Sequence, residues 1–484
     1  MDDPTPAGGS ARRPGGIVTV LAAAGVVAAL MQTLVVPLIG ELPRLLDTSP
    51  SNASWVVTAT LLAAAVATPA IGRLGDLYGK RRMLLLCTVP LVAGSVLCAV
   101  ASSLVPMIVG RGLQGVGMGL VPLGISALRD LLPAERLGSS IALLSASLGI
   151  GGALGLPISA AVAEHASWRV LFWSAAVLSA LVAALIWLLV PATPARAAGR
   201  FDLVGALGLG AGVVCLLLGV SKGGDWGWTS GTVMGLFAAA VVVLPAWGWW
   251  ELRTRDPLID LRVTARRQVL LTNVASVVVG FAMYAQSLIV PQLLQLPEAT
   301  GYGLGQSMLA AGLWMLPSGL MMMAVSPLGA RLSAARGPRT TLVAGSLVIA
   351  LGYGSSMALL GSTWGLLVVT SLCGAGVALA YGAMPALIMS AVPRSETAAA
   401  NSFNTVMRSL GTSVSAAVVG VVLAQMTTTL GGHTLPSEDG FRTGMLIGCG
   451  VALLAAAVAL TLPRLPARPA DAVAAPAPAV PTRR

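Results

Sequence analysis

Long apolar runs separated by short polar segments fill most of this chain. Most runs hold about 18 residues or more, close to the ~20 that a helix needs to cross a hydrocarbon core of ~30 Å. A helix satisfies its own backbone hydrogen bonds, so it is stable in lipid without water. The pattern therefore predicts an all-α integral membrane protein with fourteen transmembrane helices. The predicted spans are Ile17–Ile39, Ser54–Ile71, Met83–Val100, Val105–Leu128, Ile141–Val162, Val170–Val190, Leu203–Val220, Val233–Trp250, Val269–Val290, Ser307–Val325, Leu342–Leu360, Leu366–Met389, Phe403–Met426 and Met445–Leu462.

Lysine and arginine test this count, because cytoplasmic loops carry the excess of both residues. With the N-terminus placed in the cytoplasm, 23 of the 29 Lys and Arg fall in cytoplasmic segments and four fall outside. The remaining two, Arg111 and Arg408, fall within spans. Adding or removing one span would destroy this alternation, so we expect both termini to be cytoplasmic.

Composition excludes several other classes of protein. Charged residues make up 10% of the chain and hydrophobic residues 56%, whereas about 25% of a soluble protein is charged. The net charge of +11 is spread over alternate loops, which argues against a nucleic-acid partner. The chain has neither a Cys/His metal spacing nor a phosphate-binding loop, and all five cysteines lie within spans. We therefore expect no metal, no cofactor and no enzymatic activity.

An internal repeat divides the chain into two related halves. Short motifs recur at an offset close to 259 residues, which is typical of transporters built from repeated bundles. The recurring pairs are Arg73-Leu74…Gly79 with Arg331-Leu332…Gly337, Leu113-x-Gly115-x-Gly117 with Leu372-x-Gly374-x-Gly376, and Pro133 with Pro393. We predict a disordered N-terminus (1–16), a six-helix bundle (17–190), two linker helices with a loop (191–268), a second six-helix bundle (269–463) and a disordered Pro/Ala-rich tail (464–484).

The segment Gly72–Arg82 is a charged turn between the second and third predicted spans. Lys80 and Arg81 suit a loop that sets topology, but Asp76 does not, because acids add little to orientation. We therefore predict a conformational latch, in which charges at a helix end stabilise one state of the protein. The alternative is a topogenic loop without a gating role. The predicted latch residues are Gly72, Arg73, Asp76, Gly79, Lys80 and Arg81.

Several motifs together carry a family resemblance. They are the hinge Gly72–Arg82, the fourth-span sequence Arg111–Gly117, the glycine-rich fifth span Gly149–Ala161 and the pattern Asn401-x-x-Asn404-x-x-x-Arg408. With these motifs the chain resembles the major facilitator superfamily, and within it the fourteen-span drug:proton antiporters, or multidrug efflux permeases. The resemblance covers nearly the whole chain and leaves the substrate open.

One departure from that family concerns proton coupling. Members commonly carry an acid followed by Thr in the first helix, but here Met31 stands in place of the acid. Every Asp and Glu falls in a loop, a tail or a span end. Glu41 and Glu298, near the outer span ends, are the candidate proton carriers, because a half-buried carboxylate can exchange protons. The alternative for both is a solvated rim.

Two arginines fall inside predicted spans. A charge at mid-membrane costs at least ~2.5–3.5 kcal/mol on insertion scales, so each must face protein or water. Arg111 is predicted to lie in the central cavity, where it binds substrate or influences a nearby carboxylate; the alternative is an interhelical strut bonded to carbonyls. Arg408 follows the same reasoning, but it lies near the start of its predicted span and could snorkel to the membrane surface.

Uncharged polar residues are the remaining cavity candidates. They could hydrogen-bond a ligand, or they could join neighbouring helices through bonds worth ~0.6 kcal/mol on average. They are Gln32, Thr33, Gln114, Tyr284, Gln286, Asn401 and Asn404.

The fifth span presents Gly151, Gly155 and Pro157 as a small-residue face with a kink. The resemblance implies the antiporter motif, a pliable interface that favours exchange over uniport. Ordinary tight packing of two helices is the alternative, because small faces allow close approach.

The resemblance implies a secondary transporter that exports amphipathic or cationic drugs across the bacterial inner membrane. The proton gradient would be its energy source, with exchange by alternating access. The expected partners are a small-molecule substrate, protons and the lipid bilayer, with the chain acting as a monomer. The alternative is a proton-independent facilitator or a dedicated exporter of one endogenous metabolite.

Overall fold

The computed structural model describes residues 14–38, 41–192, 195, 197–430 and 433–463. The two predicted disordered tails lie outside these residues, except for 14–16. Those three residues belong to the first helix, which begins at Pro14 and not at Ile17.

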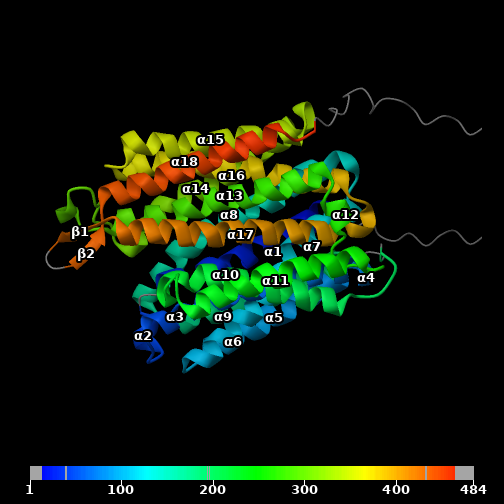
Figure 1. Ribbon diagram of the computed structural model, residues 1–484, viewed down its shortest axis with the longest axis horizontal. Helices are drawn as coiled ribbons and strands as arrows, with labels where there is room; N and C mark the ends of the chain where they lie inside the picture. Colours follow the sequence, from blue (N-terminus) through cyan, green and yellow to red (C-terminus); the bar gives the residue numbers. More distant parts are fainter. Residues whose placement is uncertain (1–13, 39–40, 193–194, 196, 431–432, 464–484) are drawn as a thin grey trace, which may run out of the picture.

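Fourteen helical spans within the described residues are long and apolar enough to cross a membrane, as predicted. Figure 1 shows them running along one common direction. The spans are α1 (Pro14–Thr33), α4 (Trp55–Tyr78), α5 (Lys80–Val100), α6 with α7 (Leu104–Val116 and Leu120–Leu131), α8 (Ala134–His165), α9 (Arg169–Leu189), α10 (Leu203–Trp226), α11 (Gly231–Arg253), α13 (Arg267–Gln295), α14 (Met308–Arg336), α15 (Pro338–Leu359), α16 (Thr363–Ala391), α17 (Thr397–Gln425) and α18 (Glu438–Leu460).

Short elements occupy the connections between the spans. The sequence pattern did not indicate the antiparallel hairpin between α17 and α18, because its strands are only four residues long. The short elements are η1 (Val36–Leu38), α2 (Leu42–Leu45), α3 (Pro50–Ala53), η2 (Gly117–Gly119), α12 (Leu261–Thr264), η3 (Glu298–Thr300), η4 (Arg394–Glu396), β1 (Thr427–Leu430) and β2 (His433–Pro436).

The charged turn predicted at Gly72–Arg82 is mostly helical, so that prediction is wrong in its extent. Helix α4 continues to Tyr78 and α5 begins at Lys80, so Gly79 alone makes the turn, with φ at 93°. Gly72 does not bend the chain and instead allows close packing, as described below. Gly337, the repeat partner of Gly79, has φ at 84° and joins α14 to α15 in the same way.

Two hydrophobic cores lie side by side. One is formed almost wholly by buried residues between Ile17 and Val190, and the other by residues between Ala275 and Leu462. In Figure 1 the helices of the second core lie above those of the first, with α8 and α17 between them. Met389 and Ala398, from the second half, pack into the first core. The domain boundaries themselves stay predictions.

The linker helices α10 and α11 cover one seam between the two cores. Leu209 and Val213 of α10 share a small core with Ala65 of α4 and with Phe403 and Val406 of α17. Helix α10 therefore contacts both halves of the molecule.

Candidate functional site

Asp76 lies at the junction of the two halves. Its carboxylate is fully buried and accepts hydrogen bonds at 3.0 Å from the backbone N–H groups of Ala398 and Ala399. These groups belong to the first turn of α17, whose N-terminus carries partial positive charge. A carboxylate from the first half thus caps a helix of the second half, 322 residues away along the chain.

Two further charged groups support this cap. Lys80 is buried and places its Nζ 3.7 Å from Asp76 and 2.5 Å from Asp130. Arg129 donates to the hydroxyl of Thr397, at the start of α17, and to the carbonyl of Val392. The cap is therefore one part of a polar network that joins α4, α5 and α7 to the start of α17. We call this network the junction, and its side of the molecule the arginine-rich side, which the charge pattern predicts to be cytoplasmic.

Asp130 and Arg129 were not among the predicted site residues. A charged pair at a span end is common in membrane proteins, so position alone did not distinguish it. One feature of the sequence could have indicated Asp130: like Asp76, it is an acid on a side of the molecule where most charged residues are arginines.

Gly72 brings α4 and α17 together beside the junction. A Cβ atom at this position would lie 2.3 Å from the Ser402 hydroxyl and 2.7 Å from the Ala398 carbonyl. Only glycine allows α4 and α17 to approach this closely, and any side chain at position 72 would push the two helices apart.

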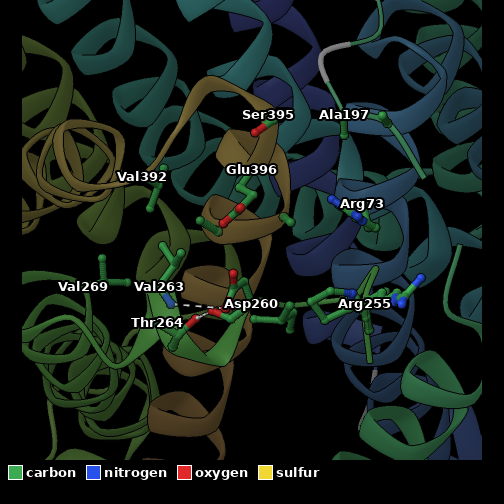
Figure 2. Close-up of a pocket in the computed structure, with 16 residues that line it drawn as sticks. Arg73, Ala197, Arg255, Asp260, Val263, Thr264, Val269, Val392, Ser395 and Glu396 are labelled. Carbon is green, nitrogen blue, oxygen red and sulfur yellow. Dashed lines mark hydrogen bonds between the residues drawn. The ribbon is translucent and has the colours of Figure 1, made fainter. Parts of the chain in front are cut away.

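Arg73 and Arg81 also contact parts of the molecule outside the cap. Arg81 donates to the carbonyl of Trp187 at the end of α9. Arg73 is 7% exposed and lines a cavity of about 190 Å³ between the hinge, η4 and the segment after α11. Figure 2 shows Arg73 and Arg255 on one side of this cavity and Asp260 and Glu396 toward the other.

Arg111 is 1% exposed, and its guanidinium is satisfied by the protein. Its Nε donates to the Val56 carbonyl at 3.1 Å, and one terminal nitrogen donates to the Met31 carbonyl and to Gln114 Oε1, both at 2.7 Å. The described part of the chain supplies no ion pair for it. The geometry is that of a strut joining α1, α4 and α6, while its role in substrate binding stays a prediction.

Gln114 extends the network around Arg111. It is fully buried, and its Nε2 donates to the hydroxyl of Ser95 on α5 at 2.8 Å. The backbone carbonyl of Met31, the residue that stands in place of the usual acid, accepts a hydrogen bond from Arg111.

Arg408 differs from Arg111 in almost every respect. It is half-buried, and its guanidinium lies 4.6 Å from the centre of the Tyr381 ring. Within the described part of the chain it makes this ring contact but no hydrogen bond or ion pair. Because α17 begins at Thr397 and not at Phe403, Arg408 is about three turns inside the helix. The expectation that it lies near the start of its span is therefore wrong.

The predicted polar residues of α17 and α13 fall mainly between helices. Asn404 donates to Asn273 and Ser276 of α13, and Asn401 donates to the Thr397 carbonyl one turn earlier. Gln286 is buried, and its side-chain oxygen has no partner in the described part of the chain.

The other polar candidates have fewer contacts. Tyr284 is half-buried. On α1, Gln32 is exposed and its amide nitrogen lies 3.6 Å from the Met118 sulfur, while the hydroxyl of Thr33 bonds to carbonyls of its own helix.

Helix α8 uses its small residues on two faces. A Cβ at Gly151 would lie 2.3 Å from the Val26 carbonyl, and one at Gly155 would lie 1.8 Å from the Thr33 hydroxyl, so both positions are contacts with α1. Pro157 is on another face, where a Cβ at Gly312 of α14 would meet its backbone at 3.0 Å. Helix α8 therefore packs tightly against both halves.

The two candidate proton carriers lie at the surface. Both Glu41 and Glu298 are exposed, and Glu41 pairs with Arg44 at 3.6 Å. This arrangement fits the alternative of a solvated rim, while proton transfer by either residue stays untested.

The family model of the Major Facilitator Superfamily matches residues 21–416 and 274–484. The chain belongs to this superfamily. Membership agrees with the resemblance drawn from the sequence and identifies a multi-pass membrane transporter, not an enzyme.

Individual relatives agree with this assignment. The multidrug resistance protein Stp of Mycobacterium tuberculosis is 29% identical over 395 residues, which cover 79% of this chain and 71% of that protein. The tetracenomycin C resistance and export protein of Streptomyces glaucescens is 27% identical over 435 residues, covering 87% and 78%. The fold is similar to that of the human organic anion transporter MFSD10 (TETRAN), with a TM-score of 0.67 at 16% identity, covering 92% of this chain and 99% of that one.

Proposed function

We propose that this protein exports amphipathic small molecules, including drugs, across the bacterial inner membrane by alternating access. The observation that carries the proposal is the capping of α17 by Asp76, which holds the two halves together at the arginine-rich side. A charge-assisted contact between two halves is suited to breaking and re-forming as one half rocks on the other. The names of two relatives support this proposal: Stp is a multidrug resistance protein, and the tetracenomycin C protein is named for resistance and export.

The proton gradient is the proposed energy source. The expected alternative, a proton-independent facilitator or a metabolite exporter, has one observation in its favour. In the described helices every Asp and Glu lies within the first or last turn, so none is placed at mid-membrane to carry a proton. Exchange would then depend on acids at the helix ends, of which Asp76 and Glu251 are the most buried.

Drug retention by cells tests the export function. Cells that express the protein should retain less of an exported dye than cells that carry an empty vector. Asp76→Asn should abolish the difference, because the amide cannot supply the charge that caps α17. Equal retention by both cell types for every dye of a panel that includes anions, neutral molecules and cations would contradict the function.

A further inference from the structure

The sign of the charge at mid-membrane has a consequence for the substrate. Arg111 and Arg408 are the charged residues that lie about two turns or more from either end of a described span, and both are cations. Arginine keeps its charge inside proteins. A cationic substrate at this level would meet two like charges in a low-dielectric environment, whereas an anion would be attracted.

The hydrogen-bonding capacity of Arg408 is unused, in contrast to that of Arg111. Arg111 donates three hydrogen bonds to protein acceptors. Arg408 stacks on Tyr381, and within the described part of the chain no acceptor reaches its five N–H groups. Tyr381 itself is 6% exposed, and its hydroxyl donates only to the sulfur of Met283, which is a weak acceptor.

Neighbouring helices hold Arg408 at the interface between the two halves. At Gly280 of α13 a Cβ would lie 3.0 Å from the Arg408 Cγ, so glycine makes room for the stem of the side chain. Arg408 and Tyr381 line a small gap together with Ser145 and Leu148 of α8, from the opposite half. The gap measures about 10 Å³, enough for a single water, so the halves must separate before a substrate can enter.

We propose that Arg408, assisted by the Tyr381 hydroxyl, anchors the substrate, and that the substrates are amphipathic anions such as carboxylates and phenolates. This inference rests on the proposed export function and replaces the expected cationic substrate with an anionic one. A guanidinium stacked on an aromatic ring is pre-organised to donate two parallel hydrogen bonds to a carboxylate. The proposed site closes when the halves meet at α8 and α16, where Ser145 donates to the Tyr381 carbonyl.

Two dyes on one xanthene scaffold test the sign of the charge. Fluorescein is an anion at neutral pH and rhodamine 123 is a cation, so the pair differs mainly in charge. The purified protein is placed in liposomes preloaded with one of the dyes, and the uptake of the same dye in radiolabelled form is followed by counterflow. We expect fluorescein to be taken up at least about tenfold faster than rhodamine 123, the factor that a hydrogen bond to a charged group provides.

Variants assign the preference to Arg408. Arg408→Gln should lower fluorescein uptake at least about tenfold, and Arg408→Lys should retain part of it, since the ammonium keeps the charge but loses the fork. The matched control is Arg331→Gln, an exposed arginine on α14, which should leave uptake unchanged. If Arg408→Gln does not fold, the dye preference of the unaltered protein still decides the question.

The outcomes separate this inference from the export function. Uptake of rhodamine 123 at a rate equal to or above that of fluorescein would overturn the anionic preference and leave export intact. Uptake of neither dye would overturn the anionic preference, and the dye panel in cells would then decide on the export function alone. A fluorescein preference that survives in a folded Arg408→Gln protein would overturn the assignment to Arg408.

Discussion

At the scale of single residues, charged side chains within the helices have two different roles: some hold helices together, and one is available to bind a ligand. Asp76 and Arg111 are both buried and hydrogen-bonded to backbone groups of other helices, so each holds helices in place. Arg408 is less buried and has unused donors, so it is the cation that remains able to bind a ligand. Burial together with hydrogen-bond partners, more than charge, separates the structural residues from the candidate binding residue.

Removing the charge of Asp76 should open the arginine-rich side. Spin labels on Arg82 and Arg394, which are exposed residues of opposite halves, would report the separation by pulsed electron paramagnetic resonance after the native cysteines are replaced. Asp76→Asn should add a longer distance, because the cap on α17 loses its negative charge and its ion pair with Lys80. Asp76→Glu keeps the charge and serves as the control. An unchanged distance distribution in Asp76→Asn would show that the junction does not hold the halves together.

Truncating Arg111 should mainly reduce stability. Arg111→Ala removes a hydrogen bond from the Val56 carbonyl, the Met31 carbonyl and Gln114, at about 1–3 kcal/mol for each buried group that stays unsatisfied. Arg408→Ala loses no such bond. Thermal unfolding in detergent should therefore occur at a clearly lower temperature for Arg111→Ala than for Arg408→Ala. Equal unfolding temperatures would contradict the distinction between strut and anchor.

At the scale of helices, glycine positions decide how closely the elements meet. Helix α17 carries the capped N-terminus and, three turns later, Arg408, so one rigid element connects the junction to the proposed anchor. Helix α4 approaches it at Gly72, and α8 approaches α1 at Gly151 and Gly155. Movement of α17 away from α4 would therefore shift both sites together.

Gly72→Ala should open the arginine-rich side without changing any charge. The added methyl group would lie 2.3 Å from the Ser402 hydroxyl, and such overpacking typically costs about 1–3 kcal/mol. The same spin-label pair should report a longer distance. Gly112→Ala on α6 is the matched control, because no atom lies within 4 Å of its Cβ position. Identical distances in both variants would exclude close approach at Gly72 as a requirement.

Gly155→Ala should weaken the packing of α8 on α1, whereas Gly152→Ala should not. A Cβ at Gly155 would overlap the Thr33 hydroxyl, but one at Gly152 meets nothing within 4 Å. We expect a loss of about 1–3 kcal/mol in the free energy of unfolding for Gly155→Ala and no loss for Gly152→Ala. Chemical unfolding followed by tryptophan fluorescence would measure both. Similar losses in both variants would contradict the packing role of Gly155, because helix propensity alone favours alanine over glycine at either position.

At the scale of the whole molecule, the fold could be predicted from the sequence, but only part of the candidate site could. Span length and the alternation of arginine predicted fourteen helices, because lipid imposes both constraints on every membrane-spanning chain. Asp76 could be singled out because an acid in a basic hinge is unusual. Its partners could not, since the N–H groups of Ala398 and Ala399 carry no sequence signal and lie in the other half of the chain.

The structure was also needed to distinguish the arginine that is bonded to protein groups, Arg111, from the one that is available to a ligand, Arg408. Both arginines lie in apolar runs. The start of α17 is rich in small and polar residues, so the span was predicted to begin at Phe403 and Arg408 was placed near its start. Whether a guanidinium finds carbonyls or remains available depends on how four or five helices pack around it. The glycine positions follow the same rule, because Gly151 and Gly152 are neighbours in sequence and differ completely in their surroundings.

The most direct test of the central claim follows drug and protons together. Purified protein would be reconstituted in liposomes that contain a pH indicator, a pH gradient would be imposed, and anionic, neutral and cationic drugs would be added in turn. The account predicts that at least one drug moves across the membrane and that protons move in the opposite direction only when that drug is present. Drug movement that ignores the gradient would contradict proton exchange and identify a facilitator, and no movement of any drug would contradict the exporter itself.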